Sequence, residues 1–111
     1  MMDSNKKFLN GTLRTILLAL LKENGKMYGY EICQLTKEKT NNHILLTEGA
    51  IYPSLHKLEK EGLIISSKEI VNGRTRKYYS LNASSMQEID SQIDLLSQFT
   101  VHLRALLNLT T

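Results

Sequence analysis

The sequence predicts a mainly α-helical protein that carries one small β-hairpin and ends in a long helix. Apolar residues recur at steps of three and four over most of the chain, which is the spacing of one helix face. The pair Asn72-Gly73 separates two β-prone runs, and an Asn-Gly pair in that position is a strong hairpin signal. From Met86 onward, an apolar period of seven residues is held over about three heptads, which indicates a helix packed along another helix.

The composition is that of one small globular domain. The 111 residues suffice for a single modest core. The formal net charge of +3 and the sequence pI near 9.0 permit nucleic-acid binding without requiring it. No apolar run reaches the length of a membrane span, and the N-terminal residues lack the pattern of a signal peptide. Cys33 has no second cysteine to pair with, so we expect a small core residue in a cytoplasmic protein with no membrane partner.

Two helices are expected in the N-terminal part of the chain. The first covers 11–24, where leucine and isoleucine residues form a wide apolar face. The second covers 27–40. The short apolar run 43–46 fits either a small strand or a segment packed beneath the next helix, and the sequence leaves both open.

A third helix is expected over about 48–61. Thr47 is a suitable N-cap, and Gly62 supplies the positive φ at which many helices end. Pro53 lies inside this helix, where it removes an N–H donor and should bend the second turn. The apolar stripe of the helix consists of Ile51, Leu55 and Leu58.

The opposite face of this helix presents small, aromatic and hydrogen-bonding residues. They are Gly49, Tyr52, Ser54, His56, Lys57 and Lys60. Such a face can lie against the phosphate backbone or a base edge of duplex DNA. The solvated face of an ordinary amphipathic helix has a similar composition, so this stretch by itself leaves both interpretations open.

A β-hairpin is expected over about 63–82. Its two-residue turn sets the register, in which the facing pairs are Val71 with Arg74, Glu69 with Arg76, and Ile64 with Leu81. The pair of Glu69 and Arg76 brings opposite charges together across the strands. Alternation then places four residues on the inward face, which are Ile64, Ile70, Tyr79 and Leu81. Cations near the tip would neutralise phosphates or enter a minor groove, and the candidate contacts are Asn72, Gly73, Arg74, Arg76 and Lys77.

The last helix is expected to start near Ser84. Either Ser84 with Gln87 or Ser85 with Glu88 fits a capping box. Its apolar seam consists of Met86, Ile89, Ile93, Leu96, Phe99, Thr100, Leu103 and Leu107. Because so small a domain has little other chain to cover this face, we expect a second copy to cover it in a twofold-symmetric dimer. The alternative is that the helix folds back on the first helix of its own chain.

The sequence gives no support to an enzyme. His43, His56 and His102 are far apart and have no cysteine or carboxylate at metal-ligand spacing, so we expect neither a metal site nor a cofactor. No Gly-rich phosphate loop, nucleophile motif or carboxylate pair stands out. No catalytic residue is therefore assigned.

A helix followed by a hairpin with a basic tip is the winged form of the helix-turn-helix. Three blocks of the sequence, Tyr28–Ile32, Glu48–Ile64 and Gly73–Leu81, together resemble the PadR family of bacterial winged-helix transcriptional regulators, named for the phenolic acid repressor. The single C-terminal helix resembles the shorter branch of that family. The resemblance implies a winged helix-turn-helix DNA-binding domain over 1–82 and a dimerisation helix over 83–111.

The implied function is that of a dimeric, sequence-specific transcriptional regulator, a repressor, that binds double-stranded DNA at a near-palindromic operator. Some relatives bind aromatic or drug-like effectors at the dimer interface, in some cases with a tryptophan. This chain has no tryptophan, so the existence and identity of a small-molecule effector stay open. Two other functions are compatible with the fold: a protein-interaction adaptor, and a small-molecule sensor that sequesters its ligand without binding DNA.

Overall fold

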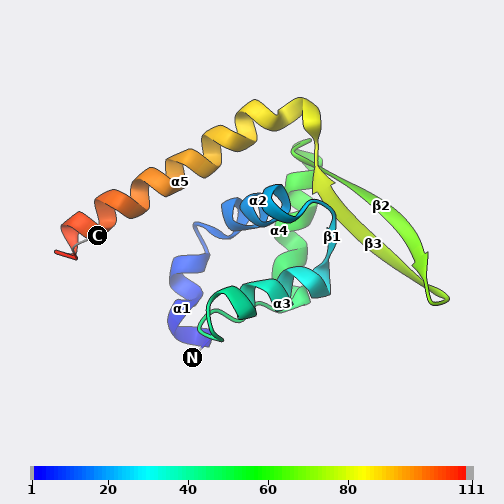
Figure 1. Cartoon of the computed structure of the whole chain (residues 1–111), viewed down its shortest axis with the longest axis horizontal. Coiled ribbons are helices and arrows are strands. Elements are labelled where there is room, and N and C mark those ends of the chain that lie inside the picture. The colour runs from blue at the N-terminus through cyan, green and yellow to red at the C-terminus, as the bar shows by residue number, and fades with distance from the viewer. Residues whose placement is uncertain (1, 110–111) are drawn as a thin grey trace.

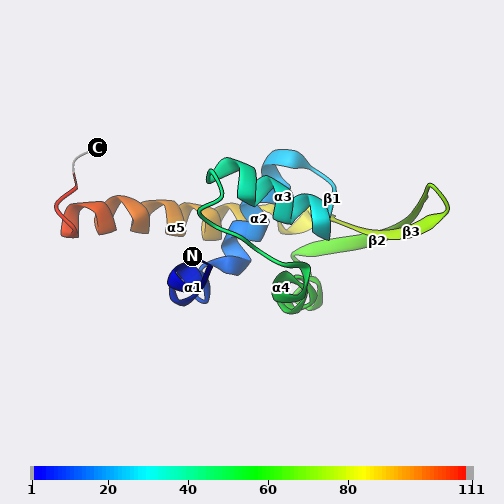
Figure 2. The ribbon, with the colours of Figure 1, turned by 90° about the horizontal axis from the view of Figure 1, so that it is seen from below.

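A computed structural model describes residues 2–109, with side chains described from Lys6 onward. The elements, in chain order, are α1 (Met2–Leu9), α2 (Leu13–Asn24), β1 (Met27–Tyr28), α3 (Gly29–Lys39), α4 (Glu48–Lys60), β2 (Ile64–Val71), β3 (Arg74–Leu81), a 3-10 turn η1 (Ala83–Ser85) and α5 (Met86–Leu106). The protein is therefore mainly helical with a small sheet, as predicted. The β2–β3 hairpin and α5 leave the helical body toward opposite ends of the molecule (Figure 1 and Figure 2).

Within the described residues the strands form a three-stranded antiparallel sheet in the order β1-β3-β2. The predicted hairpin register is confirmed, since the facing pairs include Ile64 with Leu81, Glu69 with Arg76, and Val71 with Arg74. The two-residue turn therefore dictates which side chains face one another across the hairpin.

The prediction of a helix from residue 27 is wrong at its first two positions. Met27 and Tyr28 form β1, which pairs with β3 and completes the sheet. The helix α3 begins only at Gly29, where the Glu31 carboxylate accepts the backbone N–H of Tyr28 at 3.1 Å. A side chain that binds the N–H before a helix fixes the helix start. The strand pairing joins residues distant in the sequence, which no local pattern reports.

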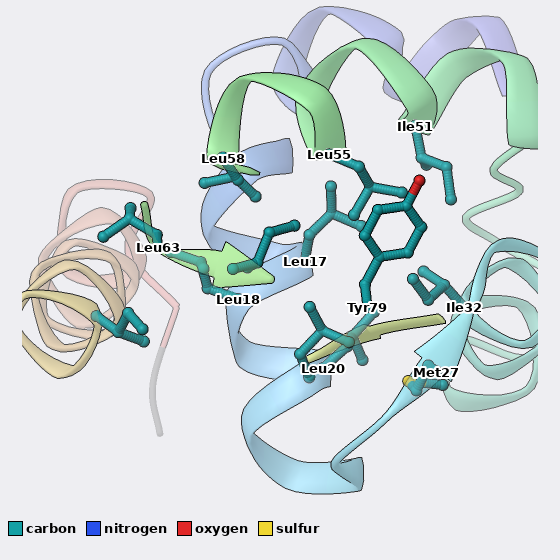
Figure 3. Packing of buried hydrophobic residues seen from close by; sticks show 13 residues of the cluster. Leu17, Leu18, Leu20, Met27, Ile32, Ile51, Leu55, Leu58, Leu63 and Tyr79 are labelled. Atoms are coloured by element: carbon teal, nitrogen blue, oxygen red, sulfur yellow. The ribbon is translucent and has the colours of Figure 1, made fainter. Parts of the chain in front are cut away.

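The hydrophobic core lies where α2, α4 and the sheet meet (Figure 3). The predicted stripe of α4 is buried there, and Tyr79 of β3 points from the sheet toward Leu55 and Ile51 of α4. Leu46 packs against this core from the loop before α4. Of the two options for residues 43–46, packing without a strand is therefore the one that the structure shows.

The helix α4 has the predicted bounds to within one residue. The Thr47 hydroxyl oxygen accepts the N–H of Ala50 at 3.2 Å, so Thr47 is the N-cap. Gly62 follows the helix with a φ of +81°, and its N–H and that of the next residue bond back into the last turn. The helix continues through Pro53.

The start of α5 is set by a contact with the end of α4. The predicted capping boxes are wrong, because the Ser85 side chain accepts no capping hydrogen bond at the start of α5 and Ser84 lies inside the 3-10 turn. The Ser84 hydroxyl donates to the side-chain oxygen of Asn82 at 2.9 Å, and the Ser85 hydroxyl donates to the Gly62 carbonyl at 3.0 Å. The chain therefore enters α5 through a 3-10 turn, and α5 begins at Met86.

The two halves of α5 have different surroundings. Ile89 is fully buried against α2, and Met86 and Ile93 pack against the same core. Beyond Ile93 the helix leaves the body, and its large apolar side chains from Leu95 onward are mostly exposed (Figure 1). The first half of α5 is thus part of the core, and the second half projects from it.

The hairpin also extends past the core. Ile64 and Tyr79 at its base are buried and Leu81 is half-buried, but Ile70 is 78% exposed. The prediction that Ile70 packs inward is wrong. It lies on the expected face of the sheet, but at that point the strands have passed beyond the helices and nothing in the described part of this chain covers that face (Figure 1).

Candidate nucleic-acid interface

The candidate interface starts with the exposed face of α4. Gly49, Tyr52, His56 and Lys57 are exposed, as predicted, while Ser54 is half-buried. Consecutive helical residues are about 100° apart around the axis, so residues two apart do not share a face. Tyr52 and Ser54 therefore flank the exposed face on opposite sides.

One side of α4 lies toward the β2–β3 hairpin and the other lies toward the region of α1 and α2. Tyr52, 48% exposed, lies on the side of Tyr79 and the hairpin. Ser54 lines a hollow of about 130 Å³ with Lys57 and with Asn10 and Arg14 from the α1–α2 region. The predicted contacts on α4 thus form a broad surface with two flanks.

The centre of that surface is occupied by residues at steps of three and four. Gly49, His56 and Lys60 lie there together with Pro53, which was not among the predicted contacts, and all four are exposed. The spacing from Gly49 to Pro53 to Lys60 is itself a helical-face signal that identifies Pro53. An added Cβ at Gly49 would meet nothing within 4 Å, so the close approach that glycine permits is open to a partner molecule.

The tip of the hairpin is a two-residue turn. Asn72 and Gly73 have φ angles of 52° and 77°, the positive values that a type I′ turn requires. Both residues are exposed, and so is Arg74, which follows them directly. The tip therefore projects a guanidinium group away from the body.

The cations behind the tip point to opposite faces of the hairpin. Side chains alternate along a strand, so Arg74 and Arg76 share one face and Lys77 lies on the other. The Lys77 ammonium lies 3.8 Å from a carboxylate oxygen of Glu59, which places it beside α4. Lys68 faces Lys77 across the strands and is exposed on the same side. Lys68 was not among the predicted contacts, although strand alternation places it on the same face as Lys77.

Arg76 has a different partner from the one predicted. Glu69 faces it across the strands, but the Glu69 carboxylate forms an ion pair with Lys26. The Arg76 guanidinium lies over the ring of Tyr28, 4.4 Å from the ring centre. The register prediction is confirmed, and the prediction of a cross-strand charge pair is corrected, because β1 brings Lys26 and Tyr28 to the edge of the sheet.

Carboxylates near the interface are held by groups of this chain. Glu61, at the end of α4, accepts two hydrogen bonds from Arg14 at 2.6 and 2.9 Å, and this hydrogen bonding lowers the pKa of Glu61. Glu59 accepts the Ser66 hydroxyl at 2.6 Å and faces Lys77. These acids therefore repel an approaching polyanion less than free carboxylates would.

The candidate dimer residues fall into two groups. Met86, Ile89 and Ile93 belong to the core of their own chain, and Leu96 is half-buried. The rest of the candidate seam is exposed and consists of Phe99, Thr100, Leu103 and Leu107. The other exposed apolar residues of this region are Leu95, Val101, Leu106 and Leu109, of which Leu95 and Leu106 widen the predicted stripe.

Neither the requirements of a metal site nor those of a membrane-spanning helix are met in the described part of the chain. Among residues 2–109, no group of three or more histidine, cysteine, aspartate or glutamate residues is placed to hold a metal ion. The Cys33 thiol is half-buried, and burial raises its pKa. None of the helices in the same range is long and apolar enough to cross a membrane.

Comparison with known proteins gives consistent matches. The model of the transcriptional regulator PadR-like family matches residues 17–91. Transcriptional regulator Rv3488 of Mycobacterium tuberculosis is 40% identical over 45 residues, which are 40% of this chain and 42% of that protein. The match thus spans less than half the length of that relative.

Two solved structures extend the comparison to the fold. A transcriptional regulator from Clostridium thermocellum has a TM-score of 0.74 at 26% identity, and the match covers 92% of this chain and 95% of that chain. Bacillus subtilis PadR, solved in complex with operator DNA, has a TM-score of 0.62 at 32% identity, with 71% of this chain and 45% of that chain covered.

Proposed function

Because this chain belongs to the PadR-like family of transcriptional regulators, which are not enzymes, we propose that it is a dimeric, sequence-specific DNA-binding repressor. The proposal is carried by the placement of the exposed α4 face and the basic hairpin next to each other in the chain. The exposed face of α4 and the basic hairpin tip belong to consecutive elements, in a chain similar to a protein whose solved structure holds operator DNA. A regulator of transcription of this kind works in the cytoplasm.

The proposed DNA contacts divide by role. Lys57 and Lys60 on α4 and Arg74 at the tip would neutralise phosphates, which positions the protein without reading sequence. Gly49 and His56 lie at the centre of the exposed face, where an approaching α4 would meet base edges in the major groove. The hairpin would follow the adjacent backbone or minor groove.

The proposed dimer rests on the exposed half of α5. Phe99, Leu103, Leu106 and Leu107 form an apolar surface on a helix that projects from the body, and a second copy with the same helix would cover it. We place the dimer segment at 95–107, and assign residues 86–93 to the core of the DNA-binding body. Two copies joined in this way would present two α4 helices to half-sites about 34 Å apart, one turn of duplex.

The test of DNA binding uses matched charge removals. Binding to DNA from the upstream region of its own gene is measured by fluorescence anisotropy over a range of salt. We expect Arg74→Ala and Lys57→Ala each to weaken binding and to lower the slope of log affinity against log salt by about 0.9 for each phosphate that the variant no longer neutralises. Lys39→Ala removes the same charge at the far end of α3, beside Glu23, and should leave both quantities unchanged.

Each outcome decides between functions. Equal effects of all three variants would show that only net charge matters and would overturn the assigned interface. Binding that is flat with salt, or lacking, would overturn DNA binding and leave the adaptor and sensor functions. Repression is tested in the same region by DNase protection: a protected inverted repeat that overlaps the promoter supports it, and protection confined to sites upstream of the promoter contradicts it.

A further inference from the structure

A cluster of aromatic and cationic side chains lies at the β1 edge of the sheet. Tyr28 is at its centre. The Arg76 guanidinium lies 4.4 Å from the Tyr28 ring centre, the Tyr78 ring meets it edge-on at 5.3 Å, and the Tyr30 ring stacks on it at 6.3 Å. Residues from β1, α3 and β3 are thus joined through one ring.

The Arg76 guanidinium forms no ion pair with Glu69, the residue that faces it across the strands. Glu69 faces Arg76 across the strands but pairs with Lys26, whose ammonium also lies 5.0 Å from the Tyr78 ring centre. Glu31 is near enough to favour the charged form of Arg76, but its carboxylate also caps α3 through the Tyr28 N–H. Hydrogen bonding to Tyr78 and the nearby Tyr28 raise the pKa of Arg76, so it is charged at every relevant pH.

A cation–π contact restrains an arginine side chain without using up its hydrogen-bond donors. The contact is made to the face of the Tyr28 ring, which is not one of the usual hydrogen-bond acceptors, and a guanidinium group has five N–H donors, so donors remain for a phosphate. A freely moving surface arginine loses side-chain entropy when it binds a phosphate. An arginine that a ring already holds has given up part of that freedom before DNA arrives.

We propose that Tyr28 is a positioning residue for DNA binding, whose ring holds Arg76 so that this wing cation meets a backbone phosphate already ordered. This inference rests on the proposed DNA-binding function. It assigns Tyr28 a role that does not require contact with DNA. It also separates the two arginines on this face of the hairpin, because Arg74 is exposed at the tip and Arg76 is held by the Tyr28 ring.

The test is a double-mutant cycle between ring and cation. The probe is a fluorescein-labelled duplex of mixed sequence, about 24 base pairs long, enough for two half-sites one turn apart. We expect Tyr28→Leu to weaken binding by about two- to fivefold per subunit, the range of an exposed cation–π contact. Tyr28→Phe keeps the ring and should restore the affinity. In an Arg76→Ala background, Tyr28→Leu should have no further effect.

A structural role alone would give a different pattern. If Tyr28→Leu weakens binding equally with and without Arg76, or not at all, the positioning role is overturned while the proposed function stands. If wild-type protein shows no salt-dependent binding to the duplex, the proposed function fails and this inference fails with it. An Arg74→Ala background should remain sensitive to Tyr28→Leu, because the tip arginine lies beyond the ring.

A second measurement needs no Tyr28 variant and remains decisive if Tyr28→Leu fails to fold. In the wild-type NMR spectrum, the side-chain protons of Arg76 should resonate upfield because of the ring beneath them. On saturation with the duplex, the Arg76 Nε–H signal should shift while the upfield displacement of the other side-chain protons persists. An Arg76 signal that DNA does not move, or a ring shift that DNA abolishes, would overturn the proposal.

Discussion

The hairpin and α5 both project from the helical body, but the far end of the hairpin is cationic and the far end of α5 is apolar. Each is anchored at its base, the hairpin through Ile64 and Tyr79 and the helix through Ile89, and each projects from the body (Figure 1). The far end of the hairpin carries Arg74 and the Asn-Gly turn, whereas the far end of α5 carries phenylalanine and leucine side chains. A cationic projection suits a polyanion, and an apolar one suits another apolar surface.

The comparison shows that exposure has different meanings at the two ends. Exposed cations remain hydrated and cost little, so the hairpin tip is stable in water as it stands. Leu106 is 81% exposed and Leu107 is 59% exposed. Burying such apolar surface stabilises a protein by about 25 cal/mol per Å². Covering the end of α5 with the partner chain of the proposed dimer would therefore be favourable even in the absence of DNA.

The largest expected effect is the loss of the dimer when charges are placed at the far end of α5. Phe99→Asp with Leu103→Asp places two charges on the exposed apolar surface, so the molecular mass measured by light scattering should fall from that of a dimer to that of a monomer. Gln98→Asp adds a charge on a different face of the same helix and should leave a dimer. An unchanged mass for the double variant would exclude this surface as the dimer interface.

The next effect compares the base and the end of α5. Ile89→Ala should lower the free energy of unfolding by about 2–5 kcal/mol, because the side chain is fully buried and a cavity remains. Leu106→Ala, at a position that is 81% exposed within the chain, should change the unfolding of the monomer by less than about 0.5 kcal/mol. Urea denaturation of both in the Phe99→Asp, Leu103→Asp background separates folding from association. Equal destabilisation would contradict the division of α5 at residue 93.

The smallest effect concerns the base of the hairpin. Burial raises the pKa of Tyr79 to about 12, above the usual value of about 10. The unfolded chain therefore loses the Tyr79 proton at lower pH than the folded chain does. The stabilisation is complete below pH about 10 and is lost as the pH rises through about 12.

Tyr79→Phe removes this group, so its melting temperature should fall less steeply between pH 10 and 12 than that of the wild type. Parallel curves for wild type and Tyr79→Phe would show that the tyrosine hydroxyl is not buried in solution.

Local patterns predicted the helix α4 and the hairpin well. The bounds of α4, the Thr47 cap, the Gly62 end and the hairpin register are confirmed, because each depends on neighbouring residues or on one turn type. The exposed face of α4 was predicted by the same reasoning. Pro53, which lies at the centre of that face and was not selected, follows from helix spacing applied more strictly.

The errors share a different cause. Met27 and Tyr28 look helical by spacing but pair with β3, and Ile70 has the right face but lies beyond the helices. Glu69 faces Arg76 and yet pairs with Lys26, which directly precedes β1. In each case the path of residues distant in the sequence decided the outcome.

The sequence by itself determined the periods, the turn and the helix ends of this protein, because those depend on backbone preferences within a few residues. Tertiary structure decided which part of the continuous apolar stripe of α5 is covered, which edge completes the sheet, and which ring holds Arg76. A period fixes the direction in which side chains point. What lies in that direction depends on the path of the rest of the chain.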